Sequence, residues 1–125
     1  MSAIIESLNL GDWLKYEAPS LYSREVATVA AAQNLPAATV VARLTASAQL
    51  VALNPTANNG AEIAVGLLAH AVNATLALED DALLIARHAI VASTVIVWPA
   101  TITAPQKAIA IAQLEQRGIL IRAAA

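Results

Sequence analysis

Few side chains in this 125-residue chain have the type and spacing that chemistry requires. The two histidines, His70 and His88, do not have the spacing of a zinc motif such as HExxH, and we interpret both as structural. The acidic run Glu79-Asp80-Asp81 could supply paired carboxylates or a cation site. It lacks the glycine and the alternating ligands of a calcium loop, so we interpret it as a charged turn.

Motifs of covalent catalysis and phosphate binding are also missing from the sequence. It contains no cysteine, which excludes disulfides, thiolate metal ligands and a cysteine nucleophile. The four glycines stand too far apart to form a GxSxG nucleophile turn or a GxGxxG dinucleotide loop. We therefore expect a protein that is not an enzyme, with no catalytic residue, no metal and no cofactor.

Aliphatic residues dominate the composition. Hydrophobic residues make up 58% of the chain, with 31 alanines and 37 residues of Val, Leu and Ile. A fully buried Leu or Ile is worth roughly 1.5–3 kcal/mol against about 0.8 for one methyl group, so the larger aliphatics must supply most of the core. Only 13% of residues are charged and the net charge is −2, which argues against disorder and against a nucleic-acid partner. These numbers favour one small domain that forms a homo-oligomer or docks on a partner.

No membrane span or secretion signal is expected. The longest uncharged stretch, residues 88–106, contains Pro99 and Pro105 and is most apolar over only about half of the ~20 residues that a spanning helix needs. The N-terminus has no basic segment followed by a long apolar one.

The N-terminal segment, residues 1–21, differs from the rest of the chain. Residues 1–21 keep no hydrophobic period, are interrupted by Gly11 and Pro19, and contain Trp13 and Tyr16, with Tyr22 directly after them. We expect an extended arm over 1–21 and a single β-rich domain over 22–125. The arm could become ordered on a partner, with its aromatic residues as anchors, or could pack on its own domain.

Short β-branched runs between turn signals predict strands in the domain. The alanine-rich stretch from Val26 to Gln33 could equally belong to a helix that starts at Ser23, because alanine favours helix. The predicted strands cover residues 26–29, 39–45, 49–53, 63–69, 82–91 and 94–98.

One helix has clear signals at both ends. Thr103 is a suitable N-cap, Pro105 falls in the first turn, and Gln106 can complete a capping box. Gly118 then terminates the helix, which we place at about Ala104–Arg117, before a closing strand over 119–122. The predicted fold class is α+β and β-rich: a small mixed barrel or sandwich-like domain with one C-terminal helix and an extended N-terminal arm.

Read in order, several segments resemble the lambda-type bacteriophage head decoration proteins over about residues 10–122. The resemblance is carried by the order and spacing of these pieces: Tyr22-Ser23-Arg24-Glu25, Gln33-Asn34-Leu35-Pro36, Arg87-His88-Ala89, Trp98-Pro99 and Arg117-Gly118-Ile119.

The resemblance implies a structural virion protein. Such a protein would form a homotrimer at three-fold and quasi-three-fold positions on the outer surface of the expanded capsid. It would bind the major capsid protein and stabilise the shell against packaged DNA, with assembly in the host cytoplasm. No nucleic acid or membrane would be a partner.

The resemblance also assigns residues. The N-terminal arm of the family orders on the capsid, often by extending a capsid-protein sheet, and this role would fall on Leu10, Trp13, Tyr16, Leu21 and Tyr22. Trp98, which ends the most apolar predicted strand, would belong to the core or to a contact between subunits.

One departure from the family concerns glycine. Relatives usually carry glycines near residues 36–43, where this chain has Ala37, Ala38 and Ala42. If one of these positions requires a positive φ, alanine there is strained; otherwise the turn is built differently or does not require glycine.

Two other functions and one structural question stay open at this stage. A non-catalytic ligand-binding β-barrel module would need a cavity lined by polar groups, and a small hydrolase would need a nucleophile with a base. The arginines Arg24, Arg43 and Arg87 could face a partner or could pair with Glu25 and Glu62.

Overall fold

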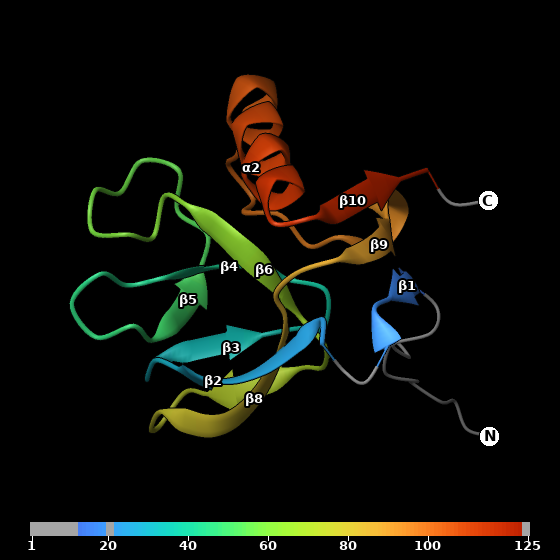
Figure 1. The fold of residues 1–125 in the computed structure, drawn as a ribbon. Coiled ribbons are helices and arrows are strands. Elements are labelled where there is room, and N and C mark those ends of the chain that lie inside the picture. The colour runs from blue at the N-terminus through green and yellow to red at the C-terminus, as the bar shows by residue number, and fades with distance from the viewer. Residues whose placement is uncertain (1–12, 20–21, 124–125) are drawn as a thin grey trace, which may run out of the picture.

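The computed structural model describes residues 13–19 and 22–123, which form a closed barrel, a three-stranded sheet, a two-stranded ribbon and one long helix (Figure 1). Both ends of the described chain lie at the three-stranded sheet, and the helix stands above the barrel. The elements, in chain order, are β1 (Leu14–Glu17), β2 (Arg24–Val29), β3 (Gln33–Leu35), β4 (Val40–Arg43), β5 (Leu50–Ala52), β6 (Ala64–Leu68), β7 (Val72–Ala74), β8 (Glu79–Ile85), β9 (Ala89–Ala92), the 3-10 turn η2 (Ser93–Val95), α2 (Ala104–Gln116) and β10 (Ile119–Arg122).

The barrel closes in the order β2-β5-β4-β6-β8. Because side chains alternate along a strand, each barrel strand sends every second residue to the interior. Val41, Leu68 and Leu84 belong to one buried cluster, and their neighbours Val40, Leu67 and Ile85 belong to another. Strands β4 and β6 are therefore almost completely buried on both faces, which explains their uninterrupted apolar sequences.

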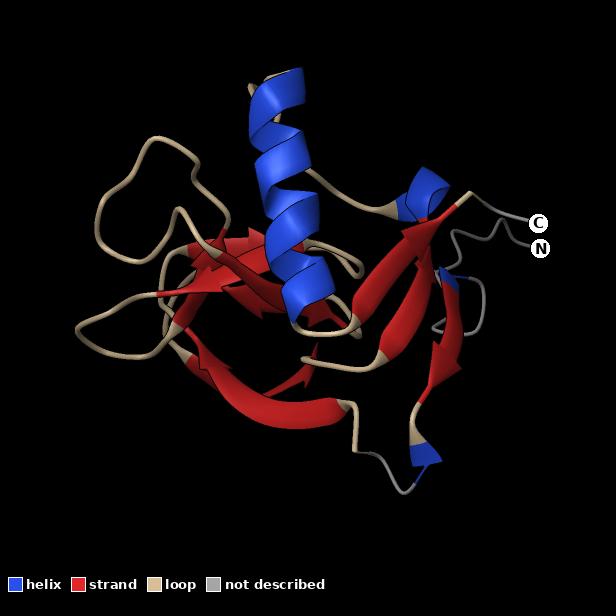
Figure 2. Ribbon diagram, turned by 45° about the horizontal axis from the view of Figure 1, so that its top comes forward, coloured by secondary structure: helices blue, strands red, loops and turns tan. Residues whose placement is uncertain are grey.

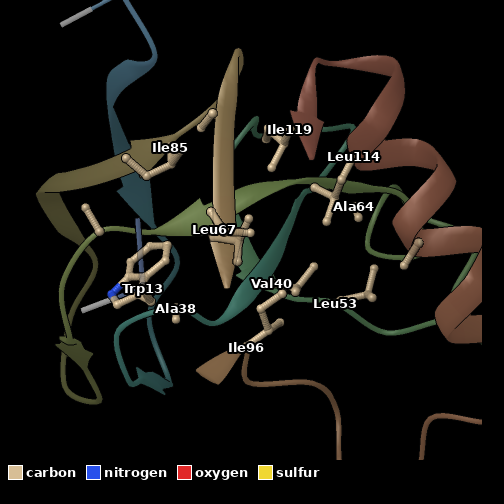
Figure 3. Close-up of a cluster of buried hydrophobic side chains, with 14 of the residues drawn as sticks. Trp13, Ala38, Val40, Leu53, Ala64, Leu67, Ile85, Ile96, Leu114 and Ile119 are labelled. Atoms are coloured by element: carbon tan, nitrogen blue, oxygen red, sulfur yellow. The ribbon is translucent and has the colours of Figure 1, made fainter. Parts of the chain in front are cut away.

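The second cluster is the main core of the molecule, and it lies where the barrel meets α2 and the three-stranded sheet (Figure 3). Its largest members include Trp13, Leu67 and Leu114, all without solvent exposure. Small residues, among them Ala64 and Ala110, are interleaved with these larger side chains. Alanine thus serves mainly as a spacer that lets backbones approach closely, and the larger residues supply most of the buried apolar area.

The three-stranded sheet has the order β1-β9-β10. The central strand β9 pairs with β1 in antiparallel orientation and with β10 in parallel orientation (Figure 2). The parallel pairing is possible because η2 and α2 lie between β9 and β10 in the chain and supply the long crossover that it requires. The outer edges of β1 and β10 have no neighbouring strand in the described sheet.

Helix α2 confirms the sequence signals. The side chain of Thr103 accepts a hydrogen bond from the backbone N–H of Gln106, and the side chain of Gln106 accepts one from the backbone N–H of Thr103. The helix ends at Gln116, one residue before the predicted end, and Gly118 adopts a φ of 78° after it. The predicted strand over 119–122 is β10.

The β-rich fold class is confirmed, and the region from Val26 to Val29 is strand rather than helix. Three predictions were wrong in detail. The acidic run at 79–81 is the start of β8, not a turn. The predicted strand 82–91 divides between β8 and β9, because His88 has a φ of 51° that redirects the chain. Residues 94–98 contain η2 and a single bridge from Val97 to Thr39 instead of a strand.

The glycine question is settled at one position. Ala38 has a φ of 66°, in the left-handed region that favours glycine, whereas Ala37 and Ala42 do not have positive φ. The backbone of Ala38 is held on both sides, since its N–H donates to Leu68 O at 2.9 Å and its carbonyl accepts from Val97 N at 3.0 Å. These two bonds hold the alanine in a conformation that costs an L-residue about 1–2 kcal/mol.

Candidate interaction surfaces

The residues predicted to form the arm divide into buried and exposed positions. Trp13 is completely buried in the main core, so it cannot fill a pocket on a partner while that core is intact. Its indole N–H finds no acceptor within residues 13–19 and 22–123. Tyr16 and Tyr22 are 51% and 55% exposed and are therefore accessible to a partner. Leu10 and Leu21 lie outside the described residues.

The base of the arm is attached to the domain by a buried serine. Ser23 is fully buried, and its hydroxyl accepts a hydrogen bond from Ala18 N and donates one to His88 O, both at 2.8 Å. The serine backbone carbonyl accepts from Ala86 N at 2.8 Å. One residue therefore joins the end of β1, the start of β2 and the chain between β8 and β9.

An ion pair reinforces the same junction. Arg24 donates two hydrogen bonds to the carboxylate of Glu17, from Nε to Oε2 at 2.7 Å and from Nη2 to Oε1 at 2.5 Å. Both side chains are about three-quarters buried. The hydrogen bond from Arg24 lowers the pKa of the Glu17 carboxyl, and the same bond raises the pKa of Arg24. The parallel geometry makes this a stronger contact than an ordinary surface pair.

Arg43 and Arg87 share one carboxylate. Glu25 accepts from Arg43 at 3.0 Å and from Arg87 at 2.5 Å, which answers the question of what these arginines face. Arg87 also donates to the carbonyl of Tyr22 and lies 5.3 Å from the centre of its ring. The ring of His88 meets Tyr22 edge to face at 5.2 Å. Tyr22 is thus held in place while half of it stays in solvent.

The outer face of the three-stranded sheet carries a row of apolar side chains. The register places Tyr16 of β1 and Leu120 of β10 on either side of Ile90 of β9. These residues line a shallow depression of about 250 Å³, together with His88 and Gly118. An apolar row beside two open strand edges is a surface that another protein can cover.

Trp98 lines a second, narrower depression. It is half-buried against the main core and forms one wall of a groove of about 120 Å³. We call this the Trp98 groove, and its lining residues are Leu35, Pro36, Thr39, Val40, Ala52, Leu53, Val97, Trp98 and Pro99. The ammonium of Lys107 lies 5.4 Å from the centre of the Trp98 ring. The Trp98 ring is therefore partly in the core and partly accessible, and its contact with another subunit stays a prediction.

The remaining chemistry-bearing residues are dispersed. His70 is exposed, with Nδ1 3.1 Å from the carbonyl of Ala71. Within residues 13–19 and 22–123, no three His, Cys, Asp or Glu side chains gather closely enough to hold a metal. The described part of the chain has no helix with the length and hydropathy to cross a membrane.

These features define a small strand-rich structural subunit whose exposed apolar surfaces are suited to contact with other proteins. The chain belongs to the family described as bacteriophage lambda head decoration protein D, whose model matches residues 3–119. The resemblance found in the sequence is confirmed, and the protein is a structural component of the virion that associates with the phage capsid. A comparison with curated proteins found no match.

Sequence reasoning missed one prominent surface feature. Leu76, in the turn between β7 and β8, is 98% exposed, and Leu78 after it is 45% exposed. The sequence from 74 to 79 has no period that separates an exposed leucine from a buried one. The only sequence feature that could have indicated their exposure is their position directly before the acidic run 79–81.

Proposed function

We propose that the protein binds the outer surface of the expanded phage capsid as a homotrimer, at three-fold and quasi-three-fold positions. There it bridges subunits of the major capsid protein and stabilises the shell against packaged DNA. Assembly takes place in the host cytoplasm. The observation that carries the proposal is the match of residues 3–119 to the head decoration family.

The proposed capsid-binding part is the N-terminal segment together with the surface beside it. Tyr16 and Tyr22 are exposed next to this segment, and Tyr16 lies in the apolar row on the three-stranded sheet. The free edge of β1 supports backbone pairing with a capsid strand, which supplies affinity without requiring a pocket. Residues 1–12 precede this edge strand and would extend the contact across the capsid surface.

Binding is tested with expanded capsids that lack decoration protein. The wild type and a variant without residues 2–12 are sedimented with expanded and unexpanded capsids, and the bound fraction is measured. We expect the wild type to bind only expanded shells and the deletion variant to bind weakly. A variant with residues 2–12 in permuted order controls for chain length. Undiminished binding by the deletion variant would overturn the role of the arm.

A deletion that extends to Tyr22 would not be a clean test. It removes Trp13 from the main core and β1 from the three-stranded sheet. Loss of binding would then follow from loss of folding. The boundary at residue 12 keeps both, and the substitutions Tyr16→Ala and Tyr22→Ala test the exposed aromatic residues separately.

The trimer and the stabilising role require their own measurements. Light scattering gives the mass of the protein in solution, and chemical cross-linking on decorated shells gives the number of copies in contact. DNA-filled heads are heated with and without the protein, and DNA release is followed with an intercalating dye. Many modest contacts act together on one shell, so we expect release at a higher temperature when the protein is bound. A monomer on the shell, or an unchanged release temperature, contradicts the corresponding part of the proposal.

The alternative of a ligand-binding barrel is not favoured by the structure. The barrel interior is filled by the cluster outside the main core, whose members include Val29, Val41, Leu50, Leu68 and Leu84. The Trp98 groove, at about 120 Å³, is well below the roughly 300–1,000 Å³ of small-molecule sites. The hollows beside Leu76 and beside Leu44, of about 550 and 360 Å³, are open surface depressions rather than enclosed cavities.

A further inference from the structure

The turn between β7 and β8 presents apolar and acidic residues side by side. We call the segment 76–81 the acidic knob. Leu76 is almost completely exposed, and Leu78 and Glu79 lie with it around one shallow depression. Glu79 and Asp81 are both exposed at the start of β8, where a register shift in the pairing with β2 interrupts the regular alternation of side chains. A single exposed leucine is common on protein surfaces, but two exposed leucines beside several carboxylates form a patch that is both apolar and acidic.

The Trp98 groove has the complementary character. It is lined mostly by apolar side chains, with an aromatic wall from Trp98 and the rings of Pro36 and Pro99. Its volume of about 120 Å³ exceeds the roughly 30 Å³ of one water molecule and suits one aliphatic side chain. Lys107 on α2 places a positive charge over the outer edge of this wall, 5.4 Å from the ring of Trp98.

The charges of the two surfaces are opposite and uncompensated within the described chain. The three ion pairs formed by residues 13–19 and 22–123 use Glu17 and Glu25, and none uses Glu79, Asp80, Asp81 or Lys107. Asp80 only accepts a long hydrogen bond from Thr28, at 3.4 Å. An acidic apolar projection and a basic apolar groove are therefore both available for a contact beyond residues 13–19 and 22–123, where opposite charges favour one register.

The knob does not occupy the groove of its own molecule, because Leu76 is 98% exposed. In the β3–β7 ribbon, Gln33 pairs with Ala74 and Leu35 pairs with Val72. The knob follows Ala74 at one end of the ribbon, whereas Leu35 and Pro36 line the groove at the other end. A projection and a recess at different places on identical subunits produce a head-to-tail contact, which closes into a ring when the rotation per subunit permits.

We propose that the acidic knob of one copy of this chain seats in the Trp98 groove of the next copy. Leu76 inserts between Trp98 and the two prolines, and the carboxylates of Glu79 and Asp81 face Lys107 of the neighbouring copy. This inference rests on the homotrimer of the proposed function and assigns the surfaces that form it.

The test compares four variants by light scattering over a range of protein concentrations. Leu76→Asp removes the inserted side chain, Lys107→Glu reverses the groove charge, and the pair Glu79→Lys with Asp81→Lys reverses the knob charge. The fourth variant carries all three charge reversals in one chain. We expect each of the first three to raise the concentration at half-assembly at least tenfold, and the fourth to return it to within threefold of the wild type.

Matched controls separate this contact from general effects. Ile63→Asp places a carboxylate at a different exposed aliphatic residue, and Lys15→Glu reverses the charge of a lysine outside the groove; both should assemble as the wild type does. Circular dichroism and the unfolding midpoint verify that every variant is folded. If the wild type is trimeric and all four variants assemble with unchanged affinity, this inference is wrong and the trimer stands. If the wild type is monomeric both in solution and on expanded shells, the trimer itself is wrong.

Discussion

The barrel and the three-stranded sheet use their strand edges in opposite ways. Each barrel strand pairs on both sides, so closure leaves no edge for another chain to join. The sheet keeps free edges on β1 and β10 and displays Tyr16, Ile90 and Leu120 on its outer face. The barrel and the sheet therefore have different roles. The barrel provides a rigid body, and the sheet provides the surface where the chain can be extended by a partner.

The largest expected effect tests how firmly the segment around β1 is anchored to the core of the domain. Trp13→Ala should lower the free energy of unfolding by about 3–5 kcal/mol, because Trp13 is fully buried in the main core. Tyr16→Ala, three residues further on, removes a half-exposed ring and should cost under about 1 kcal/mol. Chemical denaturation at one fixed protein concentration measures both. Similar losses of stability from the two substitutions would contradict the distinction between a core anchor at Trp13 and an exposed surface residue at Tyr16.

The next prediction concerns the closeness of barrel strands. A Cβ added at Gly66 would lie 2.4 Å from the carbonyl oxygen of Ile85 and 2.8 Å from Cδ1 of Leu84. Gly66→Ala must therefore push β6 away from β8, and we expect a loss of roughly 1–3 kcal/mol in the free energy of unfolding. Chemical denaturation measures this loss of stability. The outer face of the three-stranded sheet should be unchanged, so the folded variant should bind capsids as the wild type does. Wild-type stability of Gly66→Ala would show that the barrel is not tightly closed there.

A smaller effect is expected at the junction of the two regions. Glu17→Gln removes the charge that Arg24 binds between β1 and β2, and should cost about 0.2–1 kcal/mol near pH 7. Because the pKa of Glu17 is lowered in the folded state, the wild-type advantage is fully present above its unfolded pKa of about 4.3. It disappears as the pH falls through the folded pKa. Denaturation of both proteins between about pH 3 and 7 gives the difference in their free energies of unfolding. A wild-type advantage that grew toward low pH would contradict the lowered pKa of Glu17.

The smallest expected change is a stabilisation. Ala48 is exposed and has a φ of 63°, so Ala48→Gly relieves left-handed strain without losing a buried methyl group. After the greater flexibility of glycine in the unfolded chain is subtracted, the gain should be about 0.5 kcal/mol. Ala38→Gly has the same backbone benefit of about 0.5 kcal/mol but loses a fully buried methyl worth about 0.8 kcal/mol, so it should be destabilising by about 0.3 kcal/mol. Thermal unfolding of both variants ranks them, and the reverse order would refute the comparison.

Local signals determined which elements were predicted from the sequence. The cap formed by Thr103 and Gln106 and the termination at Gly118 lie within one segment, so α2 and β10 were placed to within a residue. The break at His88 and the loss of strand at 94–98 depend on contacts with distant segments, such as Val97 with Thr39. Strand β1 had no hydrophobic period because it is an edge strand, with only some of its residues facing the core.

The candidate surfaces were predicted less completely than the fold. The aromatic types at Tyr16, Tyr22 and Trp98 drew attention to them, and the structure leaves part of each ring accessible. Trp13, directly before β1, has the same chemical character but is buried, since residue type alone does not say whether a side chain faces the core or the solvent. Leu76 became visible only when the turn between β7 and β8 was placed, because exposure is a property of the folded surface.

The hydroxyl of Ser23 has a mechanical consequence. If the capsid holds residues before Trp13 while internal pressure displaces the shell, the resulting tension enters the domain through β1. It then meets the bonds from Ser23 to Ala18 and to His88 before it can reach the barrel. These bonds link the end of β1 to the chain between β8 and β9, so that tension which has passed along β1 does not reach β2 through the backbone alone. Ser23 would thus distribute tension at the point where the N-terminal segment joins the domain.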